Sequence, residues 1–235
     1  MEVFGNFNNF SQKNFGHIVF PIYLCRKKLN KKNIAMENLK DLLSKLNAES
    51  SVDTIKKTFS KIADILLFKS YITTEHGNYR LLEIEFYFKN KNHKDDVTIK
   101  RKEKEGMWWL HDYGVDLSFN SDDTNKKDVD ANYYGGILIR SMMSINNDSQ
   151  SEQKFFFGPK NCCWQLFYSS AFEQNNAPRI VINDTKFSGK MATTQRYITG
   201  KTPRENGDYR FYVEDIESLG SPKIKSNYKK TSPWK

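Results

Sequence analysis

Apolar residues recur every three to four positions in two stretches of the N-terminal third, which is the spacing of one buried helix face. This pattern predicts helices over residues 35–46 and 52–67, with Ser51 as the N-cap of the second helix. Farther along, alternation of apolar and polar residues predicts strands. The predicted strands cover residues 67–73, 79–88, 107–112, 115–119, 133–143, 179–182, 196–198 and 209–213, and a last helix is predicted to open at 155–160 and run to about 172.

Helices that precede a run of strands are typical of the α+β class. We expect one domain over residues 35–217, in which the N-terminal helices pack on a curved, mostly antiparallel β-sheet. Residues 1–34 are an N-terminal extension with one β-like piece at 18–24. Residues 218–235 are rich in Lys, Ser, Pro and Gly and are predicted to form a flexible basic tail.

The strand at 79–88 carries the most informative residue, Glu85. Alternation places Glu83, Glu85 and Tyr87 on one face and apolar side chains on the other. Because the strand is rich in aromatic and β-forming residues, we expect it to be central, and two carboxylates there are either costly or functional.

A second near-apolar strand, 133–143, contains a single cation, Arg140. Arg140 and Glu85 are natural partners. They form either a structural ion pair or a water-activating carboxylate with the cation that positions it.

The formal net charge is +9, with a pI of about 9.2, and this favours a polyanionic partner, nucleic acid first and an anionic membrane surface second. A general bias toward lysine explains the charge equally well. The sequence contains no apolar segment long enough to span a bilayer. Three cysteines, two of them adjacent, match neither a disulfide framework nor a zinc motif, so we expect an intracellular protein, in the cytoplasm, nucleoid or nucleus.

Aromatic residues cluster at 107–114, where Trp109, His111 and Tyr113 lie near a predicted turn. Aromatic rings beside a basic surface suit base stacking, and a ring at a tight turn can enter a duplex. An aromatic core with an exposed turn is the alternative.

His93, Asp95, Asp96, His111 and Asp116 have the right chemistry for metal binding or acid–base work, and a solvated loop is the favoured alternative for Asp95 and Asp96. Their spacing matches no metal motif, so no metal and no cofactor is expected. Gly158-Pro159-Lys160 precedes a predicted helix, where a cation and free backbone N–H groups form either a phosphate site or an ordinary helix start.

In order along residues 55–213, these segments resemble the alkyladenine (3-methyladenine) DNA glycosylase family. The matching motifs are Glu83-Ile84-Glu85-Phe86-Tyr87, a strand ending in Tyr113-Gly114, Gly135 to Ser141 around Arg140, Gly158-Pro159-Lys160, a faint match at Gln195 to Ile198, and Arg210-Phe211-Tyr212-Val213.

The resemblance implies that Glu85 activates a water molecule against C1′ of a flipped nucleotide and that Arg140 holds the water and the glutamate. It implies that Tyr87 stacks on the base, Tyr113 fills the gap in the duplex and Asn120 lies in the base pocket.

The sequence departs from the family where Phe86 replaces a small residue and Leu110 replaces a pocket tyrosine. The family's pocket histidine has no aligned match, although His93 could reach the site through a shorter loop. His111 and Asp116 stand where the family has apolar residues.

We therefore expect a monomeric hydrolase that cleaves the N-glycosidic bond of a damaged or modified purine in double-stranded DNA. Lys160, Arg196 and Arg210 are predicted to contact the DNA backbone, and Trp109 and His111 the substrate. Two alternatives remain: a non-catalytic nucleic-acid-binding protein on the same fold, and a hydrolase of a free nucleoside or nucleotide.

Overall fold

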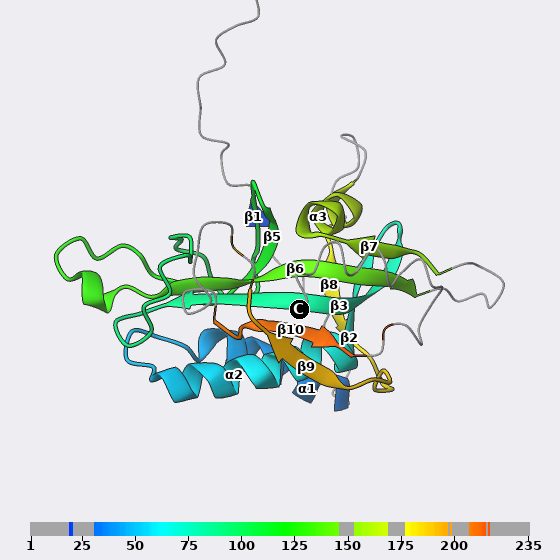
Figure 1. Cartoon of the computed structure of the whole chain (residues 1–235), viewed down its shortest axis with the longest axis horizontal. Helices are drawn as coiled ribbons and strands as arrows, with labels where there is room; N and C mark the ends of the chain where they lie inside the picture. Colours follow the sequence, from blue (N-terminus) through cyan, green and yellow to red (C-terminus); the bar gives the residue numbers. More distant parts are fainter. Residues whose placement is uncertain are drawn as a thin grey trace, which may run out of the picture.

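Helices cover one face of a large curved sheet (Figure 1). Most of the N-terminal extension and the whole predicted basic tail, 218–235, lie outside the described residues. The structure, a computed structural model, describes residues 19–20, 31–145, 153–168, 177–196, 198, 207–214 and 216, with side chains from residue 38 onward.

The two predicted N-terminal helices are present as α1 (Lys31–Ser44) and α2 (Val52–Asp64). Ser51 caps α2 as predicted, because its hydroxyl accepts a hydrogen bond of 3.3 Å from the backbone N–H of Thr54. The helical pattern extends beyond Asp64 because α2 continues into a single π-helical turn, Ile65–Lys69. The following strand therefore begins at residue 70 rather than at 67.

The sheet has ten strands among the described residues, and every pairing between them is antiparallel, which confirms the predicted α+β class. The main order is β1-β4-β5-β6-β3-β10-β9, with β2 beside β3 and β8, and β7 beside β6. The strands are β1 (Val19–Phe20), β2 (Ser70–Thr74), β3 (Gly77–Lys89), β4 (Trp108–His111), β5 (Gly114–Ser118), β6 (Tyr134–Ile145), β7 (Phe155–Phe157), β8 (Arg179–Ile182), β9 (Met191–Thr194) and β10 (Arg210–Val213).

Three details of the predicted strands are wrong. Residues 155–157 form β7 rather than opening the last helix, and β9 was not predicted. The strand predicted at 196–198 is absent at Arg196 and Ile198. Arg196 instead directs its guanidinium inward to the backbone oxygen of Phe86.

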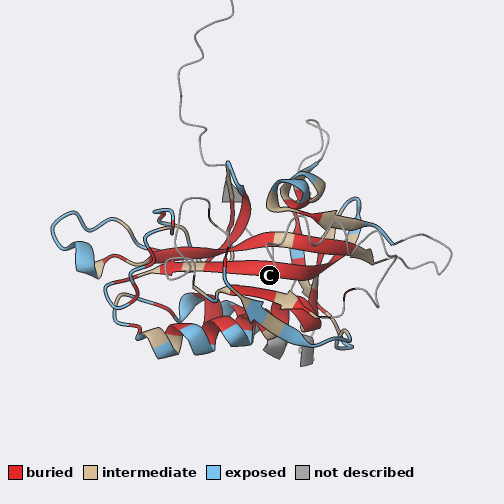
Figure 2. Cartoon of the chain, viewed as in Figure 1, coloured by how far each residue is buried: buried red, intermediate tan, exposed pale blue. Residues whose placement is uncertain are grey.

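The long central strands β3 and β6 are almost entirely buried (Figure 2). One face of β3 packs against α2, where the Phe59 ring stacks on Phe86 with centroids 4.4 Å apart and on Phe119 at 5.9 Å. This aromatic cluster forms the centre of the hydrophobic core between helix and sheet.

The other face of the sheet carries α3 (Pro159–Phe167), which packs on β5, β6 and β7 (Figure 1). The hairpin of β4 and β5 rises on the same side, so the sheet separates this face from α1 and α2. None of the described helices is both long and apolar enough to cross a membrane.

Replacing Phe59 with Ala should lower the free energy of unfolding by about 3–5 kcal/mol, because the ring is almost fully buried and stacked. Chemical denaturation would measure the change as a shifted midpoint at unchanged slope. Val129→Ala, at a site that is 70% exposed, is the control and should change stability by less than about 0.5 kcal/mol. Equal stability of the Phe59 variant and wild type would contradict the packing.

Candidate functional site

A cavity of about 690 Å³ opens on the α3 face of the sheet. Its wall is made by Tyr87 of β3, Asp116 of β5 and Arg140 of β6, together with the tip of the β4–β5 hairpin and the start of α3. A cavity of this volume is within the range of small-molecule sites and large enough for one nucleotide.

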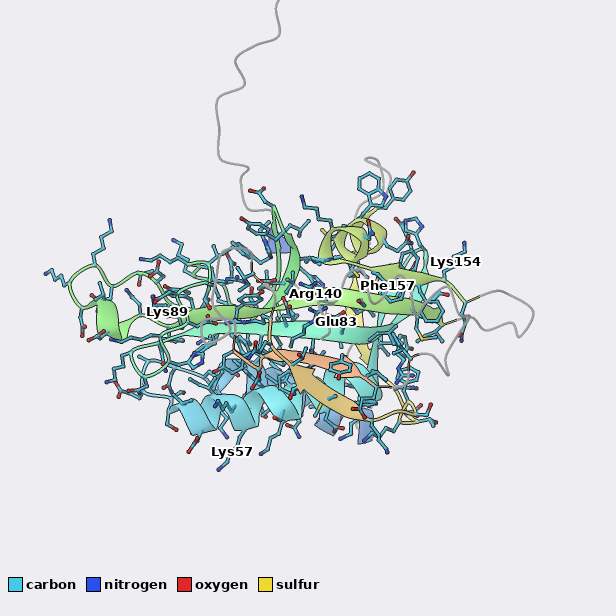
Figure 3. The ribbon with its side chains drawn as sticks, in the orientation of Figure 1. Lys57, Glu83, Lys89, Arg140, Lys154 and Phe157 are labelled. Carbon is cyan, nitrogen blue, oxygen red and sulfur yellow. The ribbon has the colours of Figure 1, made fainter. Side chains whose placement is uncertain are left out.

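Glu83 and Glu85 are almost completely buried behind this wall, and two arginines balance their charge. Arg140 reaches both carboxylates: its Nε lies 3.2 Å from Glu83 Oε1 and its Nη1 lies 3.1 Å from Glu85 Oε2. Figure 3 shows Glu83 and Arg140 side by side at the centre of the sheet. Arg210 of β10 pairs with Glu83, and Ser141 donates a hydrogen bond of 2.8 Å to Glu83 Oε2. The predicted pairing of Glu85 with Arg140 is thus present within a larger ionic cluster.

The two carboxylate oxygens of Glu85 differ in the hydrogen bonds that they accept. Oε2 accepts hydrogen bonds from Arg140 and, at 2.8 Å, from the Tyr87 hydroxyl. Oε1 accepts none from the described residues, and Arg210 Nε lies 3.8 Å from it. Burial and the adjacent Glu85 carboxylate raise the pKa of Tyr87 well above its usual range, so the hydroxyl stays a donor.

Glu85 itself does not lie on the cavity surface, whereas the side chains that hold it, Tyr87 and Arg140, do. The Glu85 carboxylate is therefore separated from the cavity by the side chains of Tyr87 and Arg140. Its Oε1 is buried as well and is not exposed to the cavity.

A second charged cluster lies directly on the cavity wall. Arg101 Nη1 is 2.7 Å from Asp116 Oδ2, and its guanidinium lies over the Trp109 ring at 3.8 Å. Burial alone would raise the pKa of Asp116, but Arg101 and His111 outweigh it and hold that pKa below its usual value. Gly136 of β6 leaves room for the pair, because a Cβ there would lie 2.4 Å from Arg101 Nη1.

Both ring nitrogens of His111 are engaged. Nε2 lies 3.1 Å from Asp116 Oδ1, and Nδ1 accepts a hydrogen bond of 3.2 Å from the Tyr113 backbone N–H. A neutral ring with its proton on Nε2 satisfies both contacts. His111 thereby fixes the hairpin tip and presents Tyr113, which is 65% exposed, at the cavity mouth.

Arg196 and Arg210 do not lie on a DNA-facing surface, which corrects that prediction. Each side chain is at most 1% exposed. Arg196 forms two hydrogen bonds, of 2.8 and 2.9 Å, to Asp95 and lies over the Tyr87 ring at 4.5 Å. Contact with phosphate would require breaking buried ion pairs, which costs several kcal/mol.

Three further predicted substrate contacts do not line the cavity. His93 is buried between the Phe88 carbonyl and the Tyr209 hydroxyl, and burial lowers its pKa. Trp109 is 2% exposed beneath Arg101. Asn120 donates a hydrogen bond of 3.1 Å to the Tyr133 hydroxyl. None of the three lines the cavity.

Lys160 and the start of α3, by contrast, do line the cavity. Gly158, Pro159, Lys160 and Asn161 all line the cavity, and Lys160 is exposed. Arg101 is a cavity-lining cation that sequence reasoning missed. Arg101 lies in a loop rich in charged residues, and no sequence pattern distinguishes it from its neighbours. Its side chain is nevertheless buried, whereas those of Lys100 and Lys102 are exposed.

Comparison with known proteins leaves the family open. No protein-family model matches the chain. The chain is 29% identical over 200 residues to the uncharacterized protein L759 of Acanthamoeba polyphaga mimivirus, and this similarity covers 77% of the chain and 81% of that protein.

Asp116→Asn should destabilise the protein at neutral pH, because it removes a charge that compensates buried Arg101. Since the folded state depresses the pKa of Asp116, the stabilisation is complete above the ordinary value of 3.8 and is lost as the pH falls through the lowered pKa. The difference from wild type, measured by urea denaturation, should be constant from about pH 7 to 5 and shrink below about 4.

The control for this series is Asp112→Asn, at an exposed carboxylate on the same hairpin. It should change stability by less than about 0.5 kcal/mol at any pH. A difference for Asp116→Asn that grew toward low pH would reverse the assigned sign.

Proposed function

We propose that the chain is a glycosylase-like hydrolase that cleaves the N-glycosidic bond of a purine nucleotide bound in the cavity. The observation that carries the proposal is Glu85: a buried carboxylate with one oxygen held by Arg140 and Tyr87, whose other oxygen accepts no hydrogen bond from the described residues. A general base needs such an available lone pair in a shielded position.

The proposed chemistry needs one carboxylate and one water. The water oxygen bonds to C1′ while the N-glycosidic bond breaks and its electron pair leaves with the base. Glu85 accepts the proton of the water, and its negative charge stabilises the oxocarbenium-like state. Since Glu85 lies behind Tyr87 and Arg140, these two side chains control where that water enters.

The rest of the cavity suits a nucleotide. Tyr87 and Tyr113 offer aromatic faces for a base, and Lys160 with the N-terminal turn of α3 offers a cation and backbone N–H groups for a phosphate. Tyr87, Arg140 and Gly158 are far apart in the sequence but line one cavity, which supports an alkyladenine-glycosylase-like fold for this α+β domain. Double-stranded DNA with an extruded base is the proposed substrate, consistent with the net charge of +9.

Glu85→Gln should lower base release by at least about 10²–10⁴-fold while retaining DNA binding, because the amide keeps the shape but cannot accept the proton. The assay would incubate protein with duplexes carrying hypoxanthine, ethenoadenine or a methylated purine, and then break abasic sites in hot alkali.

Asp112→Asn is the control for this assay, since Asp112 is an exposed carboxylate on the neighbouring hairpin and does not line the cavity. It should release the base as wild type does. Activity of Glu85→Gln equal to wild type would exclude the mechanism. Absence of cleavage by wild type, with salt-sensitive binding that survives loss of both Glu85 and Arg140, would favour a non-catalytic nucleic-acid-binding protein.

A specific observation also supports the second candidate, a hydrolase of a free nucleoside or nucleotide. His111 and Asp116 line the cavity directly, where they can contact a sugar or phosphate.

Tyr113→Ala separates the two candidates, because the exposed ring is useful for a duplex and dispensable for a small molecule. It should lower base release from duplexes by about 10-fold or more, as expected for loss of roughly 1.4 kcal/mol, and leave the hydrolysis of free nucleosides unchanged. Equal loss on both substrates would place Tyr113 in the binding of the nucleotide itself.

A further inference from the structure

Lys160 and Trp164 on the exposed face of α3, with Tyr168 at its C-cap, form a line that we call the α3 stripe. They are spaced four residues apart, so they lie above one another along the helix over about 12 Å. Cys162 and Leu166 on the opposite side are buried and anchor the helix to the sheet. The outward side of α3 is exposed or half-buried in Figure 2.

The aromatic rings of the stripe are open to solvent. Trp164 is 70% exposed and Tyr168 is 57% exposed, and their ring centroids are 5.4 Å apart at an interplanar angle of 38°. The Tyr168 ring also lies 5.7 Å from His76. Among the described residues the exposed large aromatic side chains are these two and Tyr113, and all three border the cavity or the groove beside it.

A groove of about 410 Å³ is lined by all three residues of the stripe. His111 and Lys160 line both the groove and the cavity, so the two hollows are neighbours. Leu110, Cys163 and Phe167 form the apolar floor of the groove, and its lining includes no carboxylate.

We propose that the α3 stripe and its groove bind unpaired bases of a nucleic-acid strand on one side of the nucleotide in the cavity. Exposed Trp and Tyr rings stack on bases of any sequence, and Lys160 provides the cation for the strand's phosphates at the junction with the cavity. This inference rests on the proposed function, in that the cavity holds a nucleotide. It narrows the substrate to a single strand or a locally opened duplex, because a paired base cannot lie flat on Trp164.

The occupant is a nucleic acid rather than a second protein surface for reasons of charge. The chain carries a net charge of +9, and the groove offers a lysine with no acidic residue in its lining. The groove also lies beside a cavity whose lining includes Tyr87, Tyr113 and the cations Arg101 and Arg140.

Anisotropy titration of a labelled single-stranded oligodeoxyadenylate at fixed salt tests the proposal. Trp164→Ala and Tyr168→Ala should each weaken binding by about 5- to 150-fold, the range measured for loss of one stacking ring. Trp164→Phe keeps an aromatic face and should restore most of the affinity. Val129→Ala, at another highly exposed apolar site, should bind as wild type does.

Tryptophan fluorescence provides a readout that a folding defect would not imitate. Trp108 and Trp109 are at most 2% exposed, so in a Trp234→Phe background the oligonucleotide should quench mainly Trp164. Quenching that persists in Trp164→Ala would overturn the assignment.

The remaining outcomes separate this inference from the proposed function. If both alanine variants bind the single strand as wild type does, and base release still depends on Glu85, the base-binding role of the α3 stripe is wrong and the proposed function stands. Absence of any nucleic-acid binding by wild type would overturn both. A wild-type dimer that Trp164→Ala dissociates, with unchanged oligonucleotide affinity, would show that a second copy covers the stripe and would overturn the proposal.

Discussion

Two carboxylates of like charge, Glu83 and Glu85, project from the same face of the central strand and are both buried. An unpaired ionised carboxylate in such a position costs several kcal/mol, so β3 can be central only if cations reach it. The neighbouring strands supply them, Arg140 from β6 on one side and Arg210 from β10 on the other. The register of the three central strands and the charge balance of the site therefore depend on each other.

The same ionic cluster sets the shape of the cavity. Arg140 is held by both carboxylates and Tyr87 by Glu85, so the two side chains that close the floor are fixed from behind. Arg196, clamped by Asp95, supports the Tyr87 ring from the other side. A cavity wall held in this way is preorganised. Ligand binding there loses less side-chain entropy than binding at a surface of mobile side chains.

Much of this arrangement follows from the sequence, and the failures have identifiable causes. Periodicity located α2, β3 and β6 and paired Glu85 with Arg140, because a strand buried on both faces makes each charged residue conspicuous. Periodicity could not show that Arg196 and Arg101 turn inward, since both follow segments without a regular pattern and their partners, Asp95 and Asp116, are distant in the chain. Because the sequence is rich in lysine, a buried arginine cannot be distinguished from the many exposed cations by sequence alone.

Under the proposed function, the two carboxylates near the cavity have different roles. Asp116 is closer to a ligand, but both of its oxygens are engaged, one by His111 and one by Arg101, and its lowered pKa makes it a weak base. Glu85 lies farther back, yet its Oε1 accepts no hydrogen bond from the described residues. Proton transfer needs a free lone pair more than it needs direct contact with the sugar, because one water can bridge the distance. In the proposed reaction, Asp116 therefore has a structural role at the mouth, through His111 and Tyr113, and Glu85 is the proposed base.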